Sequence, residues 1–270
     1  MRNSRLPEPP GPKGPQSQDD PLEHAVWRLR SRACWEDAAA LLAPRAARDP
    51  RAARKRTAVL IERCLFTGEG WAAAEDALRS AEALAAGDED RGAAACERGY
   101  LAYAATLLGV HDRADEARSA LGRAAALLAP GSPRRPLLNF RRGLIAQHLS
   151  DNPSDATAAF QRAHDGASAH GHRLLLSFTW RHLAALAEHD GRLAEARHGY
   201  AQSLGLREEL GYLVGIAPAL VSLAGVLAEP AEADRLRREA RRLMRLLGGV
   251  PSWLEEQLGA AEGATVNRRR

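Results

Sequence analysis

Two sets of positions recur along this chain at intervals of 36 to 43 residues, and they limit what it can fold into. The first set is always alanine, and the second, four residues later, is mostly bulky. Its members are Ala38, Ala74, Ala117, Ala156, Ala196 and Ala233, followed by Leu42, Leu78, Leu121, Phe160, Tyr200 and Arg237. Residues four apart share one face of a helix. The recurrence therefore predicts stacked helical units, and the charged Arg237 suits a terminal unit with one face in water.

Composition supports the same conclusion. Apolar residues make up 45% of the chain but aromatic residues only 5%, and isoleucine occurs only at Ile61, Ile145 and Ile216. Alanine and leucine, which dominate, are strong helix formers, whereas strands favour β-branched and aromatic residues. We expect an all-α protein.

The helical pattern begins near Pro21 and divides into about six helix pairs, so we expect one repeat domain over residues 21–259. A matching column on the first helix of five pairs contains Ala58, Leu101, Phe140, Trp180 and Ala217. A short capping helix is expected within residues 250–258. Residues 1–20, rich in proline and glycine, predict a disordered leader, and residues 260–270 a disordered basic tail.

The stretch Phe178 to Leu206 resembles a tetratricopeptide helix pair, whose pattern is W-x2-L-G-x2-Y followed by A-x3-F. The residues that match are Trp180, Leu183, Ala196 and Tyr200, with Ala184 and Ala187 in place of the glycine and the aromatic. The run Glu195 to Val226 is similar to the longer repeats in sensor regions of large bacterial transcriptional regulators. The resemblance is clear over about residues 178–246 and implies a right-handed α-solenoid that acts by binding.

In such arrays the first helix of each pair lines the concave surface, and the resemblance implies the same here. The residues expected to line a peptide-binding groove are Arg56, Arg63, Arg141, His148, Phe178, Arg181, Glu188 and His189. A trough of arginine, histidine and apolar side chains suits an extended or helical partner segment with acidic and apolar residues. The alternative is that these arginines simply belong to solvated helix faces.

The net charge of +4 comes almost wholly from arginine, because Lys13 and Lys55 are the only lysines. Basic runs, such as that from Arg235 to Arg245, would attract nucleic acid if they met on one surface. However, Glu232 and Glu239 lie within helical reach of the arginines in this run, and aromatic residues for base stacking are scarce. We therefore do not expect nucleic-acid binding.

Histidines form two groups that merit attention. His164, His170 and His172 lie close in sequence but lack the cysteine or carboxylate partners of a zinc site, and His182 and His189 lack a nucleophile. Phosphate-loop and nucleophile-elbow motifs are absent from the sequence. Cys34, Cys64 and Cys96 are an odd number without paired spacing and are expected to be reduced. We expect no enzyme activity, no cofactor and no metal.

The opening residues contain no apolar core typical of a signal peptide, and no run approaches the length of a membrane span. The sequence thus favours a cytoplasmic, regulatory scaffold, bacterial by its resemblance, that binds a protein or peptide and no membrane. A solenoid that senses a small metabolite or peptide signal, and a basic helical-repeat binder of nucleic acid, are the alternatives. The partner and the oligomeric state stay open.

Overall fold

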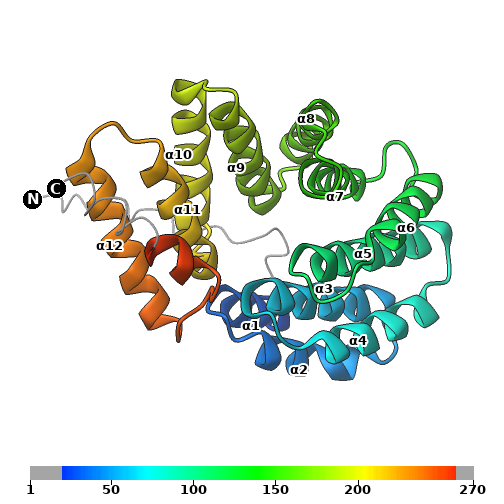
Figure 1. The fold of residues 1–270 in the computed structure, drawn as a ribbon. Coiled ribbons are helices and arrows are strands. Elements are labelled where there is room, and N and C mark those ends of the chain that lie inside the picture. The colour runs from blue at the N-terminus through cyan, green and yellow to red at the C-terminus, as the bar shows by residue number, and fades with distance from the viewer. Residues whose placement is uncertain (1–19, 260–270) are drawn as a thin grey trace, which may run out of the picture.

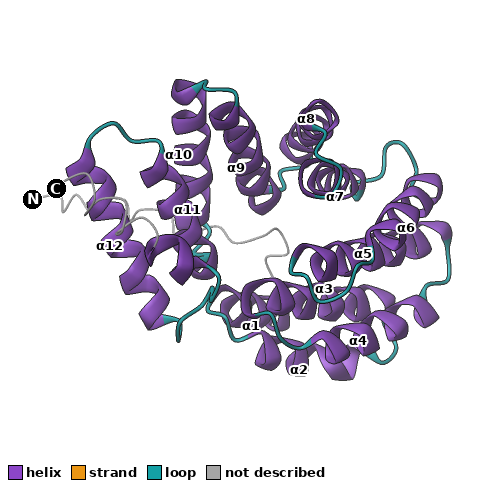
Figure 2. Cartoon of the chain, viewed as in Figure 1, coloured by secondary structure: helices purple, strands orange, loops and turns teal. Residues whose placement is uncertain are grey.

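The computed structural model describes residues 20–259, and within them the chain is helical throughout, with no strand (Figures 1 and 2). Twelve helices of 11 to 20 residues follow one another, and a short helix over residues 254–259 comes after them. They are α1 (Pro21–Ser31), α2 (Trp35–Ala46), α3 (Pro50–Thr67), α4 (Trp71–Leu84), α5 (Asp88–Leu107), α6 (Ala114–Leu127), α7 (Arg135–His148), α8 (Pro153–Ala169), α9 (Arg173–His189), α10 (Leu193–Glu209), α11 (Leu213–Gly225) and α12 (Pro230–Leu246). The expected all-α solenoid is confirmed.

The helices pack as six consecutive pairs, from α1 with α2 to α11 with α12. The recurring alanines lie at the seam of each pair, where Ala38, Ala74, Ala117, Ala156 and Ala196 are 0% exposed and Ala233 is 4% exposed. A small side chain here lets the two helix backbones approach closely. In Figure 1 the first helices α3, α5, α7, α9 and α11 face the centre of the curve, and the second helices form the outside.

Glycines and prolines set the helix boundaries. Gly171, Gly191 and Gly211 have φ of +66°, +75° and +63°, and each stands two residues before a helix begins. Glycine adopts this left-handed conformation without the steric cost that other residues incur. A glycine therefore ends one helix and precedes the next every twenty residues in this part of the chain. Asp20 and Asp49 each accept a hydrogen bond from a backbone N–H in the first turn of a helix that begins with proline.

This regular spacing corrects one sequence alignment. Counted from the first residue of its helix, Trp180 in α9 corresponds to Leu220 in α11, and the match with Ala217 is wrong by three residues. The reason is that α11 has 13 residues and α9 has 17, so the second helix begins sooner after the start of the first helix in the last pair. Aligning the repeats on their second helices therefore places the first helix of the last pair three residues out of register.

The solenoid closes on itself. One cluster of buried side chains joins α1, α2 and α3 with Leu210, Tyr212 and Val214, which lie around the turn between α10 and α11. Helices α1 and α11 are in contact, although nearly the whole chain separates them in sequence. The first and last parts of the curve therefore meet, which the repeat pattern did not predict.

The C-terminal end of the domain is covered as expected. The helix over residues 254–259 overlaps the predicted capping segment 250–258 and ends one residue after it, and its Leu254 and Leu258 are 1% and 3% exposed against α11 and α12. The predicted leader and tail lie outside the described residues, apart from Asp20. The protein has no helix in its described part that is long and apolar enough to cross a lipid bilayer.

Candidate functional site

The inner wall of the curve is the candidate site, and the closure contact occupies one side of it. Glu62 on α3 is 7% exposed and accepts hydrogen bonds from Arg30 Nε at 2.6 Å, Trp35 Nε1 at 3.1 Å and Tyr212 Oη at 2.9 Å. Three donors from three different segments converge on this carboxylate. A buried carboxylate needs such compensation, so Glu62 joins α1, α2 and α3 with the turn that precedes α11.

A second contact strengthens the closure beside the first. The indole Nε1 of Trp253 donates to the carbonyl oxygen of Leu65 at 3.1 Å, and the backbone N–H of Ser252 donates to that of Phe66 at 3.2 Å. The rings of Phe66 and Trp253 lie 6.4 Å apart between centroids. The end of α3 is thus covered by the segment that follows α12, and this part of the inner wall is filled by the protein itself.

Arg141, one of the arginines expected to line the groove, is engaged in a buried ion pair. Its side chain is 5% exposed, and its Nη2 donates to Glu97 Oε2 on α5 at 2.7 Å. Its guanidinium also lies over the ring of Tyr100, 4.4 Å from the centroid. Because the charge of Arg141 is satisfied within the protein, this residue holds α5 to α7 and is not available for a partner carboxylate.

A different set of groups, here called the inner-wall cluster, has no such compensation. It consists of Tyr103 on α5, His148 on α7, Phe178, Arg181 and His182 on α9, and Arg207 on α10. Within the described residues Arg181 makes no ion pair and no hydrogen bond. Glu188, the nearest candidate on its own helix, instead accepts the hydroxyl of Tyr200 at 2.6 Å. Arg181 is therefore a half-buried cation without a carboxylate bound to it.

Arg207 also has no carboxylate bound to it in the described residues, and it is more deeply buried than Arg181. It is 3% exposed, its Nη1 donates to the carbonyl oxygen of Gly215 at 2.7 Å, and its Nε is buried without a partner. Its guanidinium lies 5.3 Å from the ring centroid of Phe178. Burial, together with the nearby charge of Arg181, lowers the pKa of Arg207 to about 9. A cation with so depressed a pKa is in a site that favours an added negative charge.

The two histidines of the cluster lie beside the positive charge of Arg181. Burial lowers the pKa of Arg181, and it lowers the pKa of His182 well below its ordinary value, with the charges of Arg181, His148 and Arg207 adding to the effect. Burial and the charge of Arg181 likewise lower the pKa of His148. The charge of Arg181 thus contributes to the lowered pKa of the basic groups His148, His182 and Arg207.

Hydrogen bonds hold both histidines in place. His148 Nδ1 and the hydroxyl of Tyr103 share a hydrogen bond of 2.6 Å, and His182 Nδ1 donates to Gln147 Oε1 at 2.9 Å. The two imidazoles lie 5.8 Å apart between centroids. Helices α5, α7 and α9 therefore contribute to one fixed patch around Arg181.

The structure brings together only some of the residues predicted to line the groove. His148, Phe178 and Arg181 meet in the inner-wall cluster, and Glu188 is bound to Tyr200. Arg63 pairs with Glu36 at 2.7 Å, and Arg56 lines a small hollow between α2 and α4. These two arginines face the second helices and not Arg181, while His189 is exposed at the last turn of α9.

Sequence analysis missed Arg207, Glu62 and Glu97. Arg207 was overlooked because it lies on a second helix, which in a tetratricopeptide array is expected to face outward. Its position beside the αL glycine Gly211, where the chain turns back toward the inner wall, was the available signal. The two glutamates gave none, because a buried acidic residue has no distinctive pattern until its partners are known.

Comparisons with known proteins show the fold and no more. No family model matches the chain, and no curated protein matches it in sequence. Among solved structures it is similar to BtubC (BKLC) from P. vanneervenii, with a TM-score of 0.53 and 17% sequence identity over 86% of this chain and 94% of that chain. The likeness supports an all-helical, repeat-like architecture.

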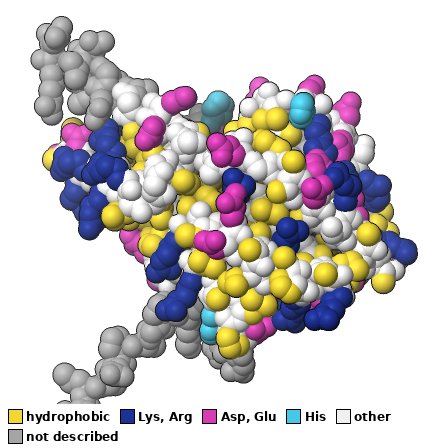
Figure 3. All heavy atoms as spheres, turned by 90° about the horizontal axis from the view of Figure 1, so that it is seen from below, with side chains coloured by type: hydrophobic (Ala, Val, Ile, Leu, Met, Phe, Trp, Pro, Cys, Tyr) yellow, Lys and Arg dark blue, Asp and Glu magenta, His cyan; other side chains and the backbone are white. Residues whose placement is uncertain are grey.

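The basic run on α12 is largely compensated along its own helix. Arg242 pairs with Glu239 at 3.1 Å and Arg237 with Asp234 at 3.1 Å, each three residues apart. Figure 3 shows the basic side chains at the left-hand edge, where α12 lies, with acidic side chains nearby. The prediction that acidic residues lie within reach of this run is confirmed.

Of the three histidines in and after α8, His164 packs against its neighbours, whereas His170 and His172 are exposed. The ring of His164 lies edge-on to Trp180 with centroids 4.7 Å apart, and its Nδ1 is 3.0 Å from the hydroxyl of Thr179. Across residues 20–259, no three histidine, cysteine or acidic side chains come together in a way that would hold a metal ion.

Proposed function

We propose that this chain is a non-catalytic scaffold of the tetratricopeptide type that binds an acidic segment of a partner protein on its inner wall, at Arg181. The observation that carries the proposal is the unpaired state of Arg181, with Arg207, His148 and His182 around it and no carboxylate bound to any of them in the described residues. A bound carboxylate would form the charge-assisted hydrogen bonds that the protein itself leaves unmade.

The surroundings of Arg181 support a protein segment in preference to a bare ion. Phe178 presents a half-buried aromatic face beside Arg181, and Ala185 continues the same face of α9 one turn further. An apolar side chain next to an acidic one in the partner would contact both kinds of group. Because closure fills the wall near α1 and the end of α3, the bound segment would lie against α5, α7 and α9.

The test uses charge reversal at Arg181 with a matched control. Arg142 on α7 is exposed and has no ion pair among the described residues, so Arg142→Glu makes the same charge change away from the cluster. Arg141→Glu is unsuitable, because it would place two carboxylates together in a buried pair and disturb folding. Binding of a fluorescent synthetic peptide of glutamate and leucine would be followed by anisotropy.

We expect Arg181→Glu to weaken binding of this peptide by roughly a hundredfold, because the substitution removes a charge-assisted contact and adds repulsion between like charges. Arg142→Glu should bind nearly as wild type does. Equal affinity of Arg181→Glu and wild type would refute the proposal. Displacement of the peptide by a small free dicarboxylate at similar concentration would instead favour a metabolite sensor, and binding of a duplex oligonucleotide that weakens steeply with salt would favour nucleic acid.

A further inference from the structure

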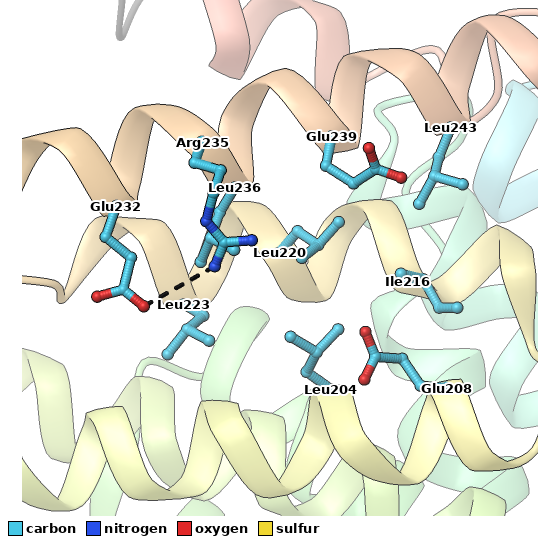
Figure 4. A pocket seen from close by; sticks show the side chains of 10 residues that line it. All are labelled: Leu204, Glu208, Ile216, Leu220, Leu223, Glu232, Arg235, Leu236, Glu239 and Leu243. Carbon is cyan, nitrogen blue, oxygen red and sulfur yellow. Dashed lines mark ion pairs between the residues drawn. The ribbon is translucent and has the colours of Figure 1, made fainter.

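A recess lies among the helices of the last two repeats. It is a cavity of about 390 Å³ between α10 and α12, with α11 as its floor (Figure 4). Its apolar lining comprises Leu204 from α10, Ile216, Leu220 and Leu223 from α11, and Leu236 and Leu243 from α12. No residue of the inner-wall cluster lines this recess, so it is independent of the proposed function.

The preceding repeat shows why this recess exists. Between α8 and α10, Trp180 lies with its ring edge-on to His164 and to His198, at centroid distances of 4.7 and 5.5 Å. Counted from the start of each helix, His164, Trp180 and His198 correspond to Leu204, Leu220 and Arg235. All three of these residues line the recess. The smaller Leu220 leaves open the space that an indole ring fills one repeat earlier.

Three carboxylates surround this apolar space. Glu208 stands on α10 and Glu232 and Glu239 on α12, as Figure 4 shows. Glu232 is 4.0 Å from Arg235, and Glu239 pairs with Arg242 at 3.1 Å. Glu208 has no ion-pair or hydrogen-bonding partner among the described residues. Because Glu232 and Glu239 each lie within ion-pair distance of an arginine of α12, Glu208 is the one carboxylate of this lining that has no paired cation in the described residues.

We propose that this recess binds a basic amphipathic helix of a partner protein, which inserts one aromatic side chain over Leu220. The inserted ring would take the place that Trp180 has in the preceding repeat, and a basic residue beside it would pair with Glu208. Apolar residues one helical turn apart would contact Leu204, Leu223 and Leu243. An amphipathic helix in an apolar groove, anchored by a few side chains, is a common mode of recognition.

The test uses two synthetic helical peptides of roughly sixteen residues, each with one tryptophan and two leucines on one face. The first peptide carries lysine and arginine at its other positions, and the second carries glutamate at every one of these. Binding to the full chain would be measured by fluorescence anisotropy. We expect the basic peptide to bind at the recess and the acidic peptide not to bind there.

Two variants locate the binding, each with a matched control. Leu220→Trp fills the recess with the side chain that the preceding repeat already accommodates, and Leu246→Trp makes the same change at a position on α12 that is 70% exposed. Glu208→Arg reverses the charge of the rim, and Glu256→Arg reverses an exposed charge in the last helix. Circular dichroism and thermal unfolding would establish that each variant is folded.

We expect Leu220→Trp and Glu208→Arg each to weaken binding of the basic peptide at least about tenfold, and both controls to bind as wild type does. Arg181→Glu should leave this affinity unchanged, which separates the recess from the inner wall. Unchanged affinity in Leu220→Trp or in Glu208→Arg would overturn the proposal. Concentration-dependent self-association in sedimentation that Leu220→Trp abolishes would also overturn it, because the occupant would then be a second copy of this chain.

Discussion

The interior arginine side chains differ in whether a carboxylate is bound to them, and this difference determines the role of each. Arg30 meets Glu62 and Arg141 meets Glu97, so both hold helices together. Arg181 and Arg207 meet no carboxylate in the described residues, and burial lowers the pKa of both. The same residue type is therefore structural at one position of the wall and a candidate for binding at another.

The buried histidines predict loss of stability in acid. The pKa of His182 lies well below its ordinary value because of burial, so between these two values the unfolded chain binds a proton that the folded chain does not. Stability from this group is fully present above pH ~6.5 and falls as the pH is lowered, by up to about 1.4 kcal/mol at pH ~5.5.

Urea unfolding at pH ~6.5 and at pH ~5.5, in wild type and in His182→Gln, measures this loss of stability. The variant should start with lower stability, because it loses the packing of the ring against Phe140 and Phe160. It should then lose less stability on acidification than wild type does. Identical losses in the two proteins would show that His182 does not account for the acid sensitivity.

At the scale of the helix, some glycines are required by close packing between helices, whereas others have free space beside them. A Cβ atom added to Gly143 on α7 would lie 2.5 Å from the ring of Phe160 on α8, whereas one added to Gly122 on α6 would meet nothing within 4 Å. Both glycines lie inside helices. Phe160 belongs to the bulky column four residues after the recurring alanine, so at this pair the second helix packs its large residue against a glycine of the first.

Gly143→Ala and Gly122→Ala should therefore change stability in opposite directions. We expect Gly143→Ala to destabilise the fold by about 1–3 kcal/mol through overpacking, because Phe160 is 0% exposed and has no free space to enter. Gly122→Ala should stabilise it by roughly 0.5–1 kcal/mol through helix propensity. Chemical denaturation of both variants checks the pair, and a stabilising Gly143→Ala would contradict the close contact between α7 and α8.

At the scale of the whole molecule, closure turns an open array into a ring-like solenoid. In an open array each repeat contacts only its neighbours. Here Tyr212 packs against Trp27 with centroids 5.8 Å apart, and its hydroxyl donates to Glu62, 150 residues away in sequence. Closure couples the first repeat to the last and fixes how much of the inner wall is open to a partner.

Removal of the closure contact should loosen the two parts that it joins. We expect Tyr212→Ala to increase amide hydrogen exchange in α1 and the second half of α3, as well as in α11, with little change in α6, α7 and α8. Tyr200→Ala is the matched control, because Tyr200 is also buried and bonded to a glutamate but lies within the pair of α9 and α10. A uniform increase along the chain in Tyr212→Ala would show that closure is not a separate contact.

Much of the fold could be predicted from the sequence because its determinants are local. Alanine at a fixed spacing, turns with glycine or proline, and helix-forming composition determined the helix pairs, their order and the seam at which each pair packs. The same pattern placed Phe178 and Arg181 on one face of α9, since residues three apart on a helix share a face. These features depend on neighbours within about forty residues.

Only the tertiary structure decided which charges are satisfied and where the surface is hollow. Arg141 and Arg181 look alike in sequence, but Glu97 reaches the first and no carboxylate of the described chain binds the second. The closure at Glu62, the burial of Arg207 and the recess over Leu220 likewise depend on contacts between helices from different repeats. A repeat pattern specifies each unit and its packing, whereas the curvature summed over six units determines which distant residues meet.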